Sequence, residues 1–303
     1  MPDVLRSRAP AVVWSAWVVL ALLLLAVVTE WRYTVAVAAS AAVLAAFPQL
    51  RTGHASGARG DRELIVMAAM YVVVVALMRA AFVGFGTDHV AGLFLCFAAV
   101  LLLGVLGPVY YETWVSHRPL SAVGLRLDNW RPTVLLGLLF ASVQFALTLW
   151  GYDLPAAQDW VPLLVMALVV GMFESVFFRG FVQSRLSARF GPVVGVSVAA
   201  VAYGLYHVGY GMGWSEIAFL TGLGVVYSIA FAIVRNVLVL WPLLTPMGSL
   251  FANLEAADIE LPWASILGFV DVAALMAVGV WLSWRHHRKE GLAEGRPHGL
   301  LPT

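Results

Sequence analysis

Long apolar runs separated by short polar connections dominate this chain. A helix needs about 20 apolar residues to cross a bilayer, so the runs predict about ten membrane-spanning helices. The expected spans are 11–29, 33–50, 64–86, 90–110, 133–150, 161–186, 193–208, 216–234, 237–253 and 262–284. Residues 115–132 are the longest internal polar connection, and the charged tail after residue 284 is expected to be disordered. The pattern therefore predicts an all-α fold, a polytopic membrane helix bundle.

Composition supports this prediction and excludes several classes of protein. Of the 303 residues, 62% are hydrophobic and 12% are charged, with a mean hydropathy of +0.89. The net charge of +1 argues against a nucleic-acid partner. Cys96 is the one cysteine, which leaves no disulfide framework and no cysteine metal site. Lys289 is the one lysine among 18 basic residues, an arginine bias that favours a bacterial source.

The distribution of basic residues predicts the orientation. With ten spans and a cytoplasmic N-terminus, all of the 18 basic residues except Arg32 and Arg79 fall on the cytoplasmic side. We therefore expect an integral protein of a bacterial plasma membrane, the inner membrane, with both termini cytoplasmic. The segment 285–288 (RHHR) forms a juxtamembrane basic cluster that is expected to attract anionic lipid at the cytoplasmic face.

Residues 172–211 place three ionisable side chains inside apolar sequence. Charged groups at membrane depth are costly, so Glu174, Arg179 and His207 suggest function. The run 190–192 (FGP) predicts a turn between two helices, with glycine after one helix and proline opening the next. Glu174 precedes Gly191 by about as many residues as His207 follows it, so an antiparallel hairpin puts both roughly 25 Å from the turn. Such a pair either activates a water molecule or simply holds two helices together.

Two further ionisable residues lie inside predicted spans. Arg79 either contacts a substrate or lipid headgroup or forms a structural pair with a carboxylate such as Glu112 or Asp271. The structural pair is the favoured interpretation, and the same interpretation applies to Asp271.

Several motifs resemble those of one protein family. Residues 174–180 (ESVFFRG) resemble an EExxFRG motif, and 189–207 (RFGPVVGVSVAAVAYGLYH) is similar to a motif with an aromatic residue four positions before a histidine. The spacing in 219–235 and the "GLR" of 121–130 are similar as well. These features together resemble the CPBP family of intramembrane proteases, which includes CAAX prenyl endopeptidases and bacterial relatives in bacteriocin self-immunity. The resemblance covers about residues 120–255.

The resemblance implies a division of the chain and a mechanism. It implies N-terminal transmembrane helices in 1–114, a CPBP-like core in 115–260, and a last helix with a cytoplasmic tail in 261–303. Glu174 and His207 would activate water for attack on a peptide bond within the membrane, and Arg179 would support the carboxylate helix. A divalent metal such as zinc is compatible with the family, but the helical core offers one histidine and the ligand set is incomplete, so no metal ligand is assigned.

The sequence departs from the family pattern at the second glutamate and in the third motif. Ser175 stands at the second glutamate, and Pro246 and Leu250 stand where the family has a histidine and an asparagine. Neither of the latter side chains can donate a hydrogen bond to an oxyanion. Nearby polar side chains that could substitute, as oxyanion donors or polar support, are Thr245, Ser249 and Asn253.

Three functions remain open from the sequence. The first is an intramembrane endopeptidase of CPBP type, a metalloprotease-like hydrolase acting on membrane proteins or lipidated peptides. The second is a catalytically inactive CPBP-like relative that serves as a membrane scaffold or immunity factor, suggested by Ser175, Pro246 and Leu250. The third is a transporter, for which the sequence shows neither paired discontinuous helices nor a relay of carboxylates.

Overall fold

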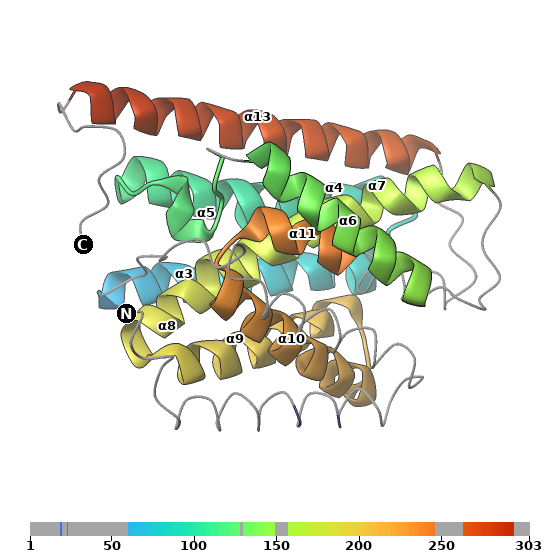
Figure 1. Cartoon of the computed structure of the whole chain (residues 1–303). Coiled ribbons are helices and arrows are strands. Elements are labelled where there is room, and N and C mark those ends of the chain that lie inside the picture. Colours follow the sequence, from blue (N-terminus) through green and yellow to red (C-terminus); the bar gives the residue numbers. More distant parts are fainter. Residues whose placement is uncertain are drawn as a thin grey trace.

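The computed structural model describes residues 60–127, 130–148, 157–245 and 263–293, together with Val19 and Leu23. Every regular element in these ranges is helical (Figure 1). In chain order the elements are α3 (Asp61–Arg79), η3 (Ala80–Phe85), α4 (Val90–Ala98), η4 (Ala99–Leu106), α5 (Gly107–Tyr110), η5 (Tyr111–Val115), η6 (Leu120–Val123), α6 (Trp130–Thr148), α7 (Ala157–Glu174), η7 (Ser175–Gln183), α8 (Ser184–Phe190), α9 (Pro192–Tyr206), η8 (His207–Tyr210), α10 (Trp214–Val234), α11 (Val237–Thr245) and α13 (Trp263–Ala293). The segments η3, η4, η5 and η7 are π-helical, whereas η6 and η8 are 3₁₀ turns.

The predicted class, an all-α membrane helix bundle, is confirmed for the described part of the chain. Within it, six helices are long and apolar enough to cross a membrane. They are Asp61–Phe85, Val90–Val115, Leu163–Phe190, Pro192–Tyr210, Trp214–Val234 and Ile266–Lys289. The count of about ten helices is not confirmed, and the expected spans 11–29 and 33–50 lie outside the described ranges apart from Val19 and Leu23.

Several basic segments meet at one end of the bundle, which we call the basic end. Arg189, at the end of α8, pairs with Asp61 at the start of α3, with 3.0 Å between nitrogen and oxygen. Near the C-terminus of α13, His286 stacks on Trp114 of η5, with ring centroids 3.6 Å apart. The beginning of α3 and the ends of η5, α8 and α13 therefore lie together, as Figure 1 shows.

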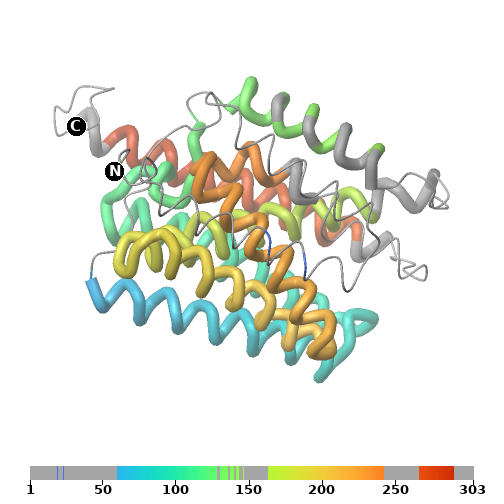
Figure 2. Tube along the Cα trace, turned by 60° about the horizontal axis from the view of Figure 1, so that its bottom comes forward, coloured from blue at the N-terminus to red at the C-terminus, as the bar shows by residue number. Residues whose placement is uncertain are grey.

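The predicted hairpin is present. α7, η7 and α8 form a continuous helical rod that ends at Phe190, and Gly191 turns the chain with φ +89°. Pro192 then occupies the first turn of α9, where its missing N–H costs no hydrogen bond. α9 packs back against η7 and α8, and α10 packs on α9 (Figure 2).

The connection expected to be polar is largely packed into the core. Leu120, Val123 and Leu125 are buried. η6 lies against η7 at Gly180, where a Cβ atom would overlap the Val123 carbonyl oxygen. The amide of Val237, at the start of α11, donates to the Gly124 carbonyl at 2.9 Å. Residues 120–125 therefore link η7 to α11.

The prediction that the chain is disordered after residue 284 is wrong for its first part. α13 continues to Ala293. Aromatic contacts explain the extension, because Arg285 stacks on Trp281 and Arg288 on Trp284, each about one helical turn earlier. Residues 294–303 lie outside the described ranges.

A buried ion network stabilises the basic end. Glu112 of η5 accepts hydrogen bonds from Arg185 of α8 and from Arg118, whose Nε lies 2.7 Å from Glu112 Oε2. Arg118 also pairs with Glu63 of α3 at 2.9 Å. Both Glu112 and Arg185 are almost fully buried. The network therefore joins α3, η5 and α8 at their common end.

Candidate functional site

The carboxylate of Glu174 is held by two tyrosines of the neighbouring helix. Glu174 is the last residue of α7 and is buried. Tyr203 Oη donates to Glu174 Oε2 at 3.1 Å, and Tyr206 Oη donates to Glu174 Oε1. A buried carboxylate is costly unless hydrogen-bonded, and these hydroxyls provide a bond to each oxygen. The matched depth expected of Glu174 and the His207 region is thus confirmed by contacts.

His207 lies beside the same two tyrosines. It begins η8, one residue after the end of α9, and is buried. Its ring centroid is 4.0 Å from that of Tyr206 and 5.1 Å from that of Tyr203. Its Nδ1 is 2.9 Å from the Tyr203 carbonyl oxygen. Because a carbonyl only accepts, Nδ1 carries the proton in this contact, and Nε2 of a neutral ring is left as an acceptor.

Glu174 and His207 therefore meet through tyrosine side chains. Among the described residues, the hydrogen-bond partners of the Glu174 carboxylate are Tyr203 and Tyr206, and His207 bonds to main chain. Tyr203 contributes to both groups, because its hydroxyl contacts Glu174 and its carbonyl contacts His207. A water molecule that bridged Glu174 and His207 Nε2 would complete a site for proton transfer.

Arg179 is buried without a hydrogen bond to any described residue. It lies in η7, and none of its three guanidinium nitrogens has such a partner. Its guanidinium carbon is instead 4.1 Å from the Tyr203 ring centroid and 5.4 Å from that of Tyr227. Arg179 thus packs on the tyrosine whose hydroxyl binds the Glu174 carboxylate. Ser175, at the position of the second glutamate of the motif, is also fully buried.

The third-motif region is described only at its start. Thr245 is the last residue of α11. Ser249 and Asn253, together with Pro246 and Leu250, lie outside the described residues. The suggested polar substitutes at these positions therefore stay predictions.

Within the part of the chain that the structure describes, Arg79 does not form the expected carboxylate pair. Its Nη1 donates to the carbonyl oxygen of Val208 at 2.9 Å. Glu112 pairs with Arg118 and Arg185 at the basic end. The expectation was wrong because the end of α3 lies against η8, so the nearest acceptor is the main chain just after His207.

The described residues do not fit a zinc centre. No group of three or more histidine, cysteine, aspartate or glutamate side chains comes together within the part of the chain that the structure describes. A catalytic zinc needs three protein ligands. Here Glu174 and His207 are the two candidates, and Tyr203 and Tyr206 already bind the carboxylate.

Sequence reasoning missed Tyr206. It singled out Tyr203 because that residue stands four positions before His207. Tyr206 stands three positions after Tyr203 on the same helix, so both hydroxyls reach one face. The three-residue spacing of Tyr203 and Tyr206 was the available signal. It was overlooked because attention went to the neighbouring His207.

Comparison with protein families identifies one matching region. Residues 155–244 match the Rce1-like family, described as type II CAAX prenyl endopeptidase Rce1-like. This region contains Glu174, Arg179, Tyr203, Tyr206 and His207. The match confirms the resemblance to the CPBP family. Comparisons with curated proteins and with solved structures give no match.

Proposed function

We propose that the chain is an intramembrane endopeptidase that uses Glu174 and His207, a proposal supported by the match of residues 155–244 to the Rce1-like family. One observation carries the proposal. A buried carboxylate at the end of α7 is hydrogen-bonded by two tyrosines of α9, next to a buried histidine. Such a group is preorganised for proton transfer away from bulk water.

In the proposed reaction a water molecule lies between Glu174 and His207. Glu174 accepts a proton from the water. At the same time the water oxygen bonds to the carbonyl carbon of the scissile peptide. His207, through Nε2, accepts the second hydrogen of the water as a hydrogen bond and so orients it. Collapse of the tetrahedral intermediate breaks the C–N bond, and the proton held by Glu174 passes to the leaving nitrogen. The products are a carboxylic acid and an amine, so the atoms of one water are added.

The developing oxyanion requires a donor that the third motif does not supply in its usual form. Pro246 and Leu250 have no side-chain donor, and we propose that Thr245, Ser249 or Asn253 supplies one. Removing one oxyanion donor typically costs 10²–10³ in rate. We therefore expect a slower enzyme than a relative with an intact third motif.

The proposed substrates are membrane proteins or lipidated peptides, and the proposed location is a bacterial plasma membrane with both termini cytoplasmic. Two features support this. Glu174 belongs to Leu163–Phe190, one of six helices in the described part of the chain that are long and apolar enough to cross a membrane. Basic residues gather at one end of the bundle, as expected for a cytoplasmic face.

The experiment is a cleavage screen with the purified full-length protein in detergent. It is incubated with a library of transmembrane and prenylated peptides, and products are identified by mass spectrometry in H₂¹⁸O. Hydrolysis predicts one ¹⁸O in each new carboxylate. His207→Ala should abolish the products, whereas His89→Ala, which changes an exposed histidine in a turn, should leave them unchanged.

An inactive scaffold or immunity factor is the second candidate, favoured by Ser175, Pro246 and Leu250. This second candidate predicts that no peptide in the library gives an ¹⁸O-labelled product. It also predicts that the wild-type protein binds membrane partners in a pull-down. Products that persist in His207→Ala would instead rule out the proposed site.

A further inference from the structure

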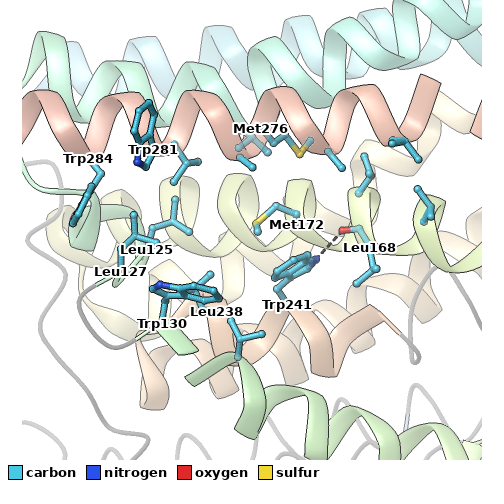
Figure 3. Close-up of a pocket in the computed structure, with 18 residues that line it drawn as sticks. Leu125, Leu127, Trp130, Leu168, Met172, Leu238, Trp241, Met276, Trp281 and Trp284 are labelled. Atoms are coloured by element: carbon cyan, nitrogen blue, oxygen red, sulfur yellow. Dashed lines mark hydrogen bonds between the residues drawn. The ribbon is translucent and has the colours of Figure 1, made fainter. Parts of the chain in front are cut away.

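A cavity lies beside α7 and is lined almost entirely by apolar side chains. It has a volume of about 770 Å³ and lies between α6, α7, α11 and α13 (Figure 3). Four tryptophans line it, namely Trp130, Trp241, Trp281 and Trp284, and we call it the tryptophan pocket. The indole N–H of Trp241 donates to the Leu168 carbonyl at 2.7 Å.

The tryptophan pocket is separate from the Glu174 site. Met172 of α7 lines the pocket, and Glu174 follows it by two residues. Two residues rotate a side chain by about 200° around a helix of 3.6 residues per turn. Accordingly, Glu174 contacts α9, and the described lining residues include none from α9 or α10.

The length of the pocket fits an extended lipid chain. Its lining runs along α13 from Val270 to Trp284, which is about 21 Å at 1.5 Å per residue. One leaflet of the bilayer hydrocarbon is about 15 Å thick, so an acyl chain can lie along the pocket.

Three arginines stack on tryptophans that line the pocket. Arg285 lies 4.6 Å from the Trp281 ring centroid, Arg288 lies 4.5 Å from that of Trp284, and Arg131 lies 5.6 Å from that of Trp130. None of these arginines forms an ion pair with a carboxylate of the described residues. Each of these arginines thus forms a cation–π contact with a tryptophan that lines the cavity. Tryptophan side chains are enriched at the depth of the lipid headgroups.

We propose that the tryptophan pocket binds an anionic phospholipid. One acyl chain lies in the cavity between α13 and the α6–α11 pair, and the phosphate lies among Arg131, Arg285 and Arg288. The cavity is long and apolar, and arginines lie at one end of it. These features match a lipid with one negative charge that enters from the leaflet at the basic end. The binding is independent of the proposed protease activity, since no residue of the Glu174 site takes part.

Native mass spectrometry of the full-length protein tests the proposal. Delipidated protein is titrated with phosphatidylglycerol and with phosphatidylcholine of identical chains. We expect one phosphatidylglycerol to be retained with at least tenfold preference. Arg285→Gln and Arg288→Gln should each weaken that binding about fivefold. Lys289→Gln, a matched charge removal in the same segment with no tryptophan contact in the structure, should change it less than twofold.

A second pair of variants tests the cavity itself. Ala277→Trp fills the pocket and should abolish retention of the lipid, whereas Ala274→Trp on an exposed part of α13 outside the lining should not. Quenching of wild-type tryptophan emission by one equivalent of phosphatidylglycerol with brominated acyl chains gives a readout without substitutions. Equal binding of the two lipids, equal behaviour of the two alanine variants, or displacement of the lipid by a prenylated peptide would each overturn the proposal.

Discussion

At the scale of single residues, the proposed function depends on the environment of Glu174. The carboxylate is buried, and its oxygens are satisfied by Tyr203 and Tyr206. Arg179 forms no ion pair with it and packs on Tyr203 instead. Glu174 is therefore positioned by hydroxyl groups, which can release it toward a water more easily than a direct arginine pair would.

Removing the Tyr206 hydroxyl should reduce cleavage without unfolding the protein. A hydrogen bond to a charged group contributes about 1.5–3 kcal/mol, so Tyr206→Phe should lower kcat/KM roughly tenfold to hundredfold. The measurement is the cleavage rate of a peptide identified in the screen. Tyr71→Phe is the matched control, because it removes a tyrosine hydroxyl that is bonded to the Ala202 carbonyl and not to Glu174. Equal losses in both variants would contradict a specific role for Tyr206.

The sequence was sufficient to predict some residues of the candidate site and not others. Glu174, Arg179 and His207 are conspicuous because charge is rare in apolar runs. Tyr206 is not, because aromatic residues are common in membrane helices and only the fold shows which hydroxyl meets a carboxylate. The partner of Arg79 was predicted wrongly for a related reason. That partner is a main-chain carbonyl, and every residue has one, so the sequence does not indicate which carbonyl accepts the hydrogen bond.

At the scale of elements, the hairpin was predictable and its distortion was not. Phe190-Gly191-Pro192 fixes the turn, since Gly191 takes φ +89° and Pro192 opens α9. The π-helical segment η7 has no such local signal. It coincides with the place where η6 presses against Gly180, so tertiary packing determines it. π-helical segments often occur at functional sites, and this one directly follows Glu174.

The ion network at the basic end should be important for stability. Glu112→Gln removes the closer of the two carboxylates that pair with the buried Arg185 guanidinium and leaves Glu63 at 3.9 Å, so we expect a loss of about 3 kcal/mol in the free energy of unfolding. Unfolding is followed by circular dichroism in mixed micelles. Asp61→Asn removes an exposed pair with Arg189, in which the Asp61 side chain is 81% accessible, and should cost less than about 1 kcal/mol. Similar losses in the two variants would show that burial of the network adds nothing.

At the scale of the whole molecule, the class of fold follows from apolar run length, but the number of helices does not. The described part of the chain contains six spans. Segment 115–132 shows why polarity alone does not predict which connections are packed. Its sequence is polar, yet Val123 and Leu125 are buried in the core. The basic end, by contrast, follows from charge alone, since arginines at successive polar connections must meet on one side.

The orientation can be measured by cysteine labelling. In a Cys96→Ala background, Arg189→Cys lies at the basic end and Asp88→Cys in the turn between the first two described spans. A membrane-impermeant maleimide added to intact bacterial cells should label Asp88→Cys. It should label Arg189→Cys only after permeabilisation. The reverse pattern would place the basic end outside and contradict the proposed orientation.

The central claim is that Glu174 is the general base of a peptide hydrolysis, and one rate ratio tests it most directly. The cleavage rate of a single peptide from the screen is compared between wild type and Glu174→Gln at equal folded concentration. Glutamine retains the size of the side chain and loses its ability to accept a proton, so the rate should fall about 10²–10⁴-fold. A Glu174→Gln variant that cleaves within twofold of wild type would contradict the proposed mechanism.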